Sequence, residues 1–368
     1  MRYLFSFLLI EAIASLSFGA EPKSFPKALI DAWDKQKCFP VWSGNSYDEG
    51  LINYQQATFI LETEDLLPAF NVHSQLKPGD LKNLPAPDQP FGLSFFFLDN
   101  ENKHLLQEAK TFKKLKRLGI HNGNIDEKEI LVIADLTELE ELQLFGTKIS
   151  DQGLMALTKI KNLKRLGLNN TKITDEGIAT LKAFEKLERL DLGYNPQLTD
   201  QATPPLVEMK SLKYLDLHYT KITDEGLKSL AKMEHLTGIH LVSTKTTATG
   251  LKSLAPLKNL ERLQIDGQAV DQDSLPAILG MKKLKYLGLN VSSFDVVSPG
   301  DADFKKLEVL TDLQRLAVYR WKITDESLAT IKGFKKLDYL EIGQTQIKLN
   351  SIEQLKKDYP KWRIFPVR

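Results

Sequence analysis

The chain has 368 residues, of which 42% are hydrophobic and 26% are charged, and its formal net charge is +1. These proportions are ordinary for a globular protein with a large apolar core. The nearly balanced charge excludes the global attraction to polyanions that is typical of nucleic-acid-binding proteins, so no nucleic-acid partner is expected.

The first residues have the pattern of a secretory signal peptide. Arg2 is followed by apolar residues up to Phe18, and the small residues Ser17 and Gly19 allow cleavage after Gly19 or Ala20. Glu11 interrupts the apolar region, so a helix retained in a cytosolic protein is the alternative interpretation. We expect residues 1–19 to be removed and the protein to be exported to the periplasm, the cell surface or the extracellular medium. No later stretch reaches about 20 apolar residues, so no transmembrane span is predicted.

Residues 20–91 differ from the rest of the chain and are predicted to form a small N-terminal capping subdomain. Eight of the 16 prolines lie between residues 21 and 91. An amphipathic helix is predicted from about Pro26 to Lys37, followed by a turn at residues 43–45 and a strand at residues 57–61. Cys38 is the only cysteine, which excludes an intramolecular disulfide and favours a bacterial type of exported protein. With no histidine nearby, Cys38 is interpreted as an apolar filler and not as a nucleophile.

A repeated motif, Leu-x-x-Leu-x-Leu, dominates the remainder of the sequence. Its first leucines are separated by 24 residues in seven steps, by 25 in one and by 29 in one. They are Leu115, Leu139, Leu163, Leu187, Leu212, Leu236, Leu260, Leu284, Leu313 and Leu337. Such regular spacing is typical of a solenoid in which each repeat packs on its neighbours. The longest step carries an insertion near residues 295–301, which is predicted to loop out.

Each repeat changes its hydrophobic period partway along. The Leu-x-Leu portion alternates as a strand does, as in Leu215-Asp216-Leu217. A segment such as Thr223-Asp224-Glu225-Gly226 then provides a helix-capping threonine and acidic residues for the first turn of a helix. Apolar residues at helical spacing follow, as at Leu227, Leu230 and Met233. The repeats therefore predict parallel strands on the inner side of a curved array and helices on the outer side.

This pattern resembles the leucine-rich repeats related to the cysteine-containing subclass, found in F-box ubiquitin-ligase subunits and in bacterial exported proteins. The resemblance covers about residues 92–368 and implies an α/β leucine-rich-repeat solenoid, or horseshoe, that serves as a binding scaffold. Where the family has Asn or Cys after the strand, this chain keeps Asn195 and otherwise usually has threonine, whose hydroxyls are expected to satisfy backbone groups in the turn. These threonines are Thr147, Thr171, Thr220, Thr244 and Thr345, whereas Gly123, Gln268, Ser292 and Trp321 depart from the pattern.

The residue before the second leucine of each motif is predicted to face the concave surface. In order, these residues are Arg117, Glu141, Arg165, Arg189, Tyr214, Gly238, Arg262, Tyr286, Arg315 and Tyr339. Arg and Tyr are enriched at binding hot spots, which favours a partner-binding row; the alternative is that their stems cover an exposed strand surface with no partner. Exposed aromatic and basic residues are also expected at one rim, namely His121, Phe145, Tyr194, Tyr219, Tyr319, Arg320 and Trp321, although folding into the turn where threonine usually stands is the alternative for Trp321. The eight Arg and Tyr residues of the row, with Tyr219 and Tyr319, are the predicted partner-binding residues.

One polar cluster has the residue types of a metal site. Asp191, Asp216 and His240 occupy the same row in three successive repeats, and His218 lies two residues beyond Asp216. Carboxylate and imidazole groups together are ligands of Zn²⁺ and similar ions. A solvated polar strand face is the more common explanation, so no metal and no other cofactor is predicted.

The sequence contains no motif that carries chemistry, such as a G-x-S-x-G elbow, a phosphate-binding glycine loop or H-E-x-x-H. We therefore expect an exported, non-catalytic and monomeric scaffold whose concave face recognises a protein or other macromolecular partner. The alternatives are an intracellular F-box-like ubiquitin-ligase arm and an enzyme within residues 21–91. The second is disfavoured because that segment has one cysteine and one histidine, His73.

Overall fold

A computed structural model describes residues 25–43, 67–72, 76–266, 270–271, 273–290 and 299–367. The predicted signal peptide, the strand at residues 57–61, residues 44–45, His73, Gln268, Ser292 and most of the insertion at 295–301 lie outside the described residues. The chain divides into two compact units. The first comprises Met1–Asn124 with Glu138–Glu141, and the second comprises Ile125–Thr137 with Leu142–Arg368.

The first unit begins with helix α2 (Lys27–Asp34), where the sequence predicts a helix over residues 26–37. Strands β1 (Phe39–Ser43), β2 (Leu67–Val72), β3 (Phe91–Phe96) and β4 (Leu115–His121) follow, with helix α3 (His104–Ala109) between the last two. Strand β1 is antiparallel to β2, whereas β2, β3 and β4 are parallel. A parallel strand, β2, therefore already precedes residues 92–368, the range that the sequence assigns to the repeats.

Aromatic packing forms the core of this first unit. Trp33 is fully buried and stacks on Phe70 with ring centroids 4.0 Å apart, and Phe25 stacks on Phe70 at 4.4 Å. The Trp33 indole donates a hydrogen bond of 3.0 Å to the carbonyl of Pro85, so its one polar atom is paired. Cys38 is also buried, which agrees with its interpretation as a filler.

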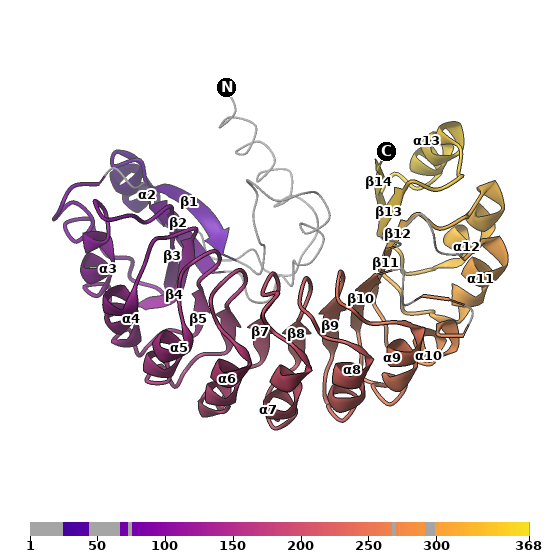
Figure 1. Ribbon diagram of the computed structural model, residues 1–368. Coiled ribbons are helices and arrows are strands. Elements are labelled where there is room, and N and C mark those ends of the chain that lie inside the picture. Colours follow the sequence, from indigo (N-terminus) through magenta and orange to yellow (C-terminus); the bar gives the residue numbers. More distant parts are fainter. Residues whose placement is uncertain are drawn as a thin grey trace. The chain divides into compact units, whose positions relative to one another are not determined.

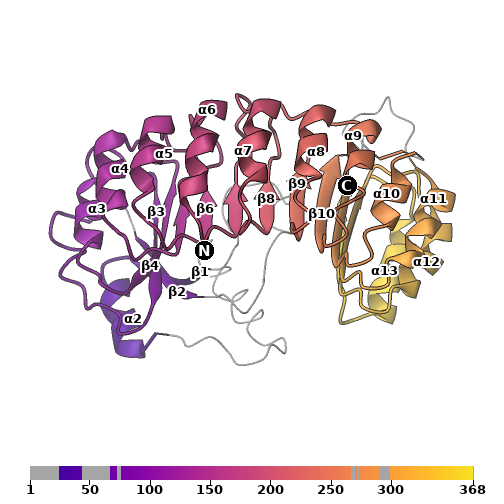
Figure 2. The ribbon, with the colours of Figure 1, turned by 90° about the horizontal axis from the view of Figure 1, so that it is seen from below.

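The second unit repeats a strand and a helix along its whole length (Figures 1 and 2). Its strands are β5 (Glu141–Gln143, whose first residue belongs to the first unit), β6 (Arg165–Gly167), β7 (Arg189–Asp191), β8 (Tyr214–Asp216), β9 (Gly238–Leu241), β10 (Arg262–Asp266), β11 (Tyr286–Asn290), β12 (Arg315–Tyr319), β13 (Tyr339–Gly343) and β14 (Arg363–Val367). Its α-helices are α4 (Glu127–Ala134), α5 (Asp151–Leu157), α6 (Asp175–Ile178), α7 (Thr203–Val207), α8 (Asp224–Leu230), α9 (Ala248–Ser253), α10 (Leu275–Leu279), α11 (Asp301–Lys305), α12 (Leu328–Gly333) and α13 (Leu349–Asp358). Short 3₁₀ helices η3 (Ala179–Ala183), η4 (Asp200–Ala202), η6 (Lys306–Val309) and η7 (Asp325–Ser327) extend or replace some helical turns.

The strands of the second unit lie side by side in sequence order, and each neighbouring pair from β6 to β14 is parallel. Within this unit the strands line the inner side of the curve and the helices line the outer side (Figure 1), as the sequence predicts. Leu166, Leu190, Leu215 and Leu263 are fully buried between the two layers. Among the described residues, no helix is long and apolar enough to cross a membrane.

An aspartate in each of several repeats binds the helix start of the next repeat. Asp151 accepts hydrogen bonds from the backbone N–H of Thr174 at 2.9 Å and from the Thr174 hydroxyl at 2.6 Å. The same pair of bonds joins Asp175 to Thr199, Asp200 to Thr223, Asp224 to Thr247 and Asp301 to Thr324. We call each of these pairs an aspartate–threonine link. The links connect consecutive repeats on the side of the helix N-termini.

The glycine of the Asp-Glu-Gly segment makes room for this link. A Cβ atom on Gly177 would lie 2.0 Å from the Asp151 Oδ1 atom, and one on Gly250 would lie 2.3 Å from the Asp224 Oδ1 atom. Neither glycine has a positive φ. The glycine is therefore required by the close approach of the previous repeat's carboxylate and not by backbone conformation.

Candidate binding face of the strand ladder

The predicted Arg/Tyr residues of the second unit form one continuous row across the parallel strands. The strand registers place Arg165 beside Arg189, Arg189 beside Tyr214, and Tyr214 beside Gly238. The row continues through Arg262, Tyr286, Arg315 and Tyr339. It ends at Arg363 in β14, a residue outside the row predicted from the sequence. The match of Arg363-Ile364 to the Arg-Leu pairs of earlier strands is the signal that would have identified it.

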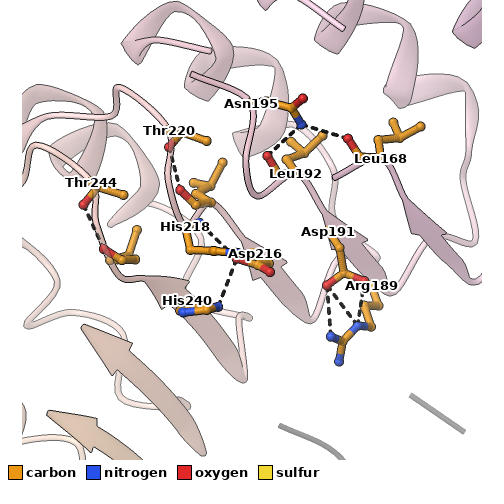
Figure 3. A network of polar contacts seen from close by, with 12 residues as sticks. Leu168, Arg189, Asp191, Leu192, Asn195, Asp216, His218, Thr220, His240 and Thr244 are labelled. Atoms are coloured by element: carbon orange, nitrogen blue, oxygen red, sulfur yellow. Dashed lines mark hydrogen bonds and ion pairs between the residues drawn. The ribbon is translucent and has the colours of Figure 1, made fainter. Parts of the chain in front are cut away.

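Arg189 is held by contacts on its own face of the sheet. Its guanidinium lies 4.0 Å from the centroid of the Tyr214 ring and forms an ion pair with Asp191 at 3.0 Å (Figure 3). The Nε atom donates to both carboxylate oxygens of Asp191, at 3.1 and 3.0 Å. Burial is the main reason that the pKa of the Tyr214 hydroxyl is raised, so the ring is a neutral hydrogen-bonding group.

The members of the row differ in exposure. Arg189, Tyr214 and Tyr286 are buried, whereas Arg165, Arg262, Arg315 and Tyr339 are half-buried. The buried three are therefore packed against neighbouring side chains, whereas the other four present more of their surface to solvent. In the first unit, Arg117 is buried and forms an ion pair of 3.3 Å with Glu141.

Positive charge accumulates at the C-terminal end of the row. Burial and the neighbouring charge of Arg315 lower the pKa of Arg262, and burial and the charge of Arg363 lower the pKa of Arg315. Arginine remains protonated despite such shifts, so the guanidinium groups repel one another across the intervening tyrosines. An anionic group that binds here would relieve this repulsion.

Tyr319 is not exposed at the rim. Its side chain is buried, and its hydroxyl donates a hydrogen bond to the Glu341 carboxylate of the next strand. Burial, together with this hydrogen bond, raises the pKa of the Tyr319 hydroxyl. Burial also raises the pKa of Glu341, while hydrogen bonds from Tyr319 and Tyr339 oppose that shift. Tyr319 is thus a buried hydrogen-bond partner of Glu341.

Trp321 is also buried, at 1% exposure, and packs edge-on against Phe304 with centroids 6.2 Å apart. Of the two interpretations of Trp321, burial at the turn is therefore the right one and exposure at the rim is wrong. An indole ring occupies the place of the usual threonine because it can fill the core beneath the turn, which a hydroxyl side chain cannot.

Two tyrosines do form an exposed aromatic rim. Tyr219 is 49% exposed and stacks on Tyr194 with centroids 4.7 Å apart and planes 13° from parallel. Both residues have positive φ, 55° for Tyr194 and 52° for Tyr219. The equivalent positions of other repeats also have positive φ, at Phe97, Asn122, Gly146, Asn170, Ser243, Arg320 and Gln344, so this conformation is a regular feature of the turn.

The polar cluster predicted from the sequence divides in two. Asp191 is engaged by Arg189, whereas Asp216, His218 and His240 come together (Figure 3). His218 Nδ1 lies 2.6 Å and His240 Nδ1 lies 3.1 Å from the same oxygen, Asp216 Oδ1. Burial by itself raises the pKa of Asp216, but the charges and hydrogen bonds of the two histidines outweigh it and hold that pKa well below its usual range. Burial lowers the pKa of His240 despite the opposing effect of Asp216.

The threonines after the strands act largely as predicted. Thr147, Thr171, Thr220 and Thr244 each donate a hydroxyl hydrogen bond to the carbonyl three residues earlier, at 2.6–2.9 Å. Asn195 does more than these threonines, because its amide donates to the carbonyls of both Leu168 and Leu192 (Figure 3). The Asn195 side chain therefore joins two repeats at this turn.

A comparison with protein-family models matches residues 93–355 to the family described as leucine-rich repeat region. The chain is a leucine-rich repeat protein. The match spans the repeated strands and helices described above, and it fits the parallel sheet with helices between the strands. A search of curated proteins finds no match to this leucine-rich repeat protein.

Three of the solved structures that are similar to this chain come from two bacteria. An internalin (inlF) from Listeria monocytogenes is 22% identical, with 82% of this chain and 89% of that chain covered and a TM-score of 0.49. Internalin C2 from the same organism is 24% identical, with 59% and 84% covered and a TM-score of 0.42. A leucine-rich repeat protein of Leptospira interrogans is 20% identical, with 80% and 88% covered and a TM-score of 0.41.

Proposed function

We propose that this leucine-rich repeat protein is an exported, non-catalytic scaffold that binds a protein partner on the inner face of its second unit. The observation that carries the proposal is the row of Arg and Tyr side chains that runs in register from β6 to β14, interrupted only by Gly238. Arg and Tyr combine large contact area with several hydrogen-bonding groups, which is why they dominate binding hot spots.

Two further features support a protein partner of particular chemistry. The repelling guanidinium groups of Arg262, Arg315 and Arg363 favour acidic side chains on the partner. The stacked pair of Tyr194 and Tyr219 lies three residues beyond the ends of β7 and β8, and Tyr219 is exposed, so the pair offers an aromatic surface. We therefore expect a partner surface that combines carboxylates with apolar groups.

The binding test compares variants on the two sides of the second unit. A partner is first captured with the wild-type chain from the exported fraction, and its affinity is then measured for Arg262→Ala, Tyr219→Ala, Lys182→Ala and Lys228→Ala. We expect the first two to weaken binding by about 30-fold, a typical hot-spot effect, and the outer lysines to have no effect. Lys182 and Lys228 are suitable controls because both are exposed and form only surface ion pairs, with Glu208 and Glu225. Loss of binding in the lysine variants with none in the inner variants would refute the choice of face.

Export and assembly state are tested separately. The proposal requires that the natively expressed protein lacks about its first 19 or 20 residues in an intact-mass measurement, and that it fractionates outside the cytoplasm. Sedimentation should show a monomer in the absence of partner. A full-length cytosolic protein would contradict the exported role without affecting the assignment of the binding face.

A further inference from the structure

Three potential metal ligands converge on one point of the inner face. Asp216 is the last residue of β8, His218 lies two residues further along the chain, and His240 lies in β9. One ligand atom from each, a carboxylate oxygen or an imidazole nitrogen, lies within 4.8 Å of the other two. All three side chains are buried, with 4–5% exposure. Among the described residues, these three form the one group of at least three His, Cys, Asp or Glu side chains close enough together to hold a metal ion.

The strand ladder itself brings the three groups together. The parallel register places Asp216 directly beside His240, and residues two apart on an extended chain face the same side, so His218 joins Asp216. Gly193 of the preceding repeat leaves space for the His218 ring, because a Cβ there would lie 2.1 Å from its atoms. Tyr194 packs edge-on against the other side of that ring at 4.5 Å. These neighbours therefore hold the His218 side chain beside Asp216.

Arg189 leaves this group with a single carboxylate. It donates hydrogen bonds to both oxygens of Asp191, the residue of β7 that lies beside Asp216 of β8. Asp191 therefore does not join the cluster. The resulting set of one carboxylate and two imidazoles is a ligand type suited to Zn²⁺ and neighbouring divalent transition metals, and poorly suited to Ca²⁺ or Mg²⁺, which prefer oxygen ligands.

We propose that Asp216, His218 and His240 bind one divalent transition-metal ion of the zinc type. In the metal-free arrangement, both Nδ1 atoms donate hydrogens to Asp216 Oδ1. On binding, each imidazole changes to the tautomer that carries its hydrogen on Nε2, and the lone pairs freed on the two Nδ1 atoms coordinate the ion beside Asp216 Oδ1. Metal–ligand distances of about 2.0–2.1 Å separate tetrahedral donor atoms by about 3.3 Å. The present separations of 2.6 and 3.1 Å therefore need to widen by less than 1 Å.

The ring orientation indicates what movement accompanies binding. The two imidazoles are stacked 4.5 Å apart and only 13° from parallel, so one ion cannot lie in both ring planes. A rotation of the rings about their Cβ–Cγ bonds turns both Nδ1 lone pairs toward a common point. Three protein ligands leave the fourth tetrahedral position open for water or for a donor group from outside the chain.

The test uses the full chain, stripped of metal with a chelator that is then removed by dialysis. We expect Zn²⁺ titrated in a calorimeter to bind with a stoichiometry of one and to raise the unfolding temperature. Asp216→Asn and His240→Gln, which keep side-chain size and hydrogen-bonding capacity, should each weaken binding at least tenfold. His235→Gln is the matched control, because this histidine is half-buried and instead contacts the carbonyl of Met209 at 3.2 Å. That control should bind zinc as the wild type does.

Two results would overturn the proposal. One is the absence of stoichiometric zinc binding, which would make the cluster a hydrogen-bonded Asp–His pair of structural importance only. The other is unchanged binding in Asp216→Asn and His240→Gln. If these variants do not fold, Co²⁺ added to the wild type decides the matter. A strong visible spectrum of four-coordinate cobalt supports the site, and the weak spectrum of six-coordinate cobalt contradicts it.

Discussion

Asp151, Thr174 and Gly177 offer the sharpest test of how consecutive repeats are joined. The Asp151 carboxylate accepts two hydrogen bonds from Thr174, at 2.9 and 2.6 Å, and fills the space where a Gly177 side chain would be. Replacing Asp151 by Ala removes both bonds. Hydrogen bonds to a charged group contribute about 1.5–3 kcal/mol each, and the site is half-buried, so we expect a loss of about 2 kcal/mol in unfolding free energy.

Gly177→Ala acts on the same two bonds from the other side. The new Cβ would lie 2.0 Å from Asp151 Oδ1, so the carboxylate must leave Thr174 and the cost is again about 2 kcal/mol. Alanine in a helix is about 1 kcal/mol more favourable than glycine, which leaves a net loss of about 1 kcal/mol. In the double variant the carboxylate is already gone, so only the gain from alanine is added and the net loss is again about 1 kcal/mol.

The assay is chemical denaturation of the wild type, both single variants and the double variant. If the two sites are independent, the double variant should lose about 3 kcal/mol of unfolding free energy, the sum of the two single losses. If they share the same two bonds, it should lose about 1 kcal/mol, which is a coupling energy of about 2 kcal/mol. Gln152→Ala, an exposed change next to Asp151, is the control and should be nearly neutral. Additive losses within 0.5 kcal/mol would refute the argument that the glycine exists to admit the aspartate.

Two further predictions concern the core and pH. Leu215→Ala removes a fully buried side chain between neighbouring repeats and should cost about 2–5 kcal/mol in denaturant unfolding; a loss under about 1 would contradict the strand register. Burial lowers the pKa of His121 from its ordinary value of 6.5 to about 4 in the folded protein. Between these two values the unfolded chain binds a proton that the folded protein does not, so stability falls as the pH drops from 6.5 toward 4. Between pH 7 and pH 5 this residue should remove about 1–2 kcal/mol of stability, a dependence that His121→Gln should abolish; an equally steep pH profile in that variant would show that other groups cause it.

The fold was largely predictable because one periodic signal specifies it. The leucine spacing gives the strand positions, and constant spacing forces equivalent residues into register, so Arg165, Arg189 and Tyr214 could be placed in one row from the sequence. The threonine hydroxyls were predictable for the same reason, since each bonds within its own repeat.

The site was less predictable because it depends on contacts between side chains of different repeats. Asp151 reads from the sequence as a residue of a helix first turn, and nothing in the period shows that it reaches the next repeat. The pairing of Asp191 with Arg189 was accessible, because residues two apart on a strand share a face. The burial of Tyr319 was not, because it depends on Glu341, which comes from the next strand.

The aspartate–threonine links also determine how such an array can change in length. Each link has its acceptor in one repeat and its donors in the next, so the repeats of Thr174–Asp175, Thr199–Asp200 and Thr223–Asp224 each carry one donor set and one acceptor, whereas Ala248 stands at the acceptor position after Thr247. Within this stretch, a segment of 24 or 25 residues that is duplicated or deleted as a whole leaves all links paired at both junctions. The last repeat needs a different solution, and there Asp325 accepts from the backbone of Lys348 and the hydroxyl of Ser351 at the start of α13. The end of the array is thus defined by a substitute donor, while its middle can be extended by copying.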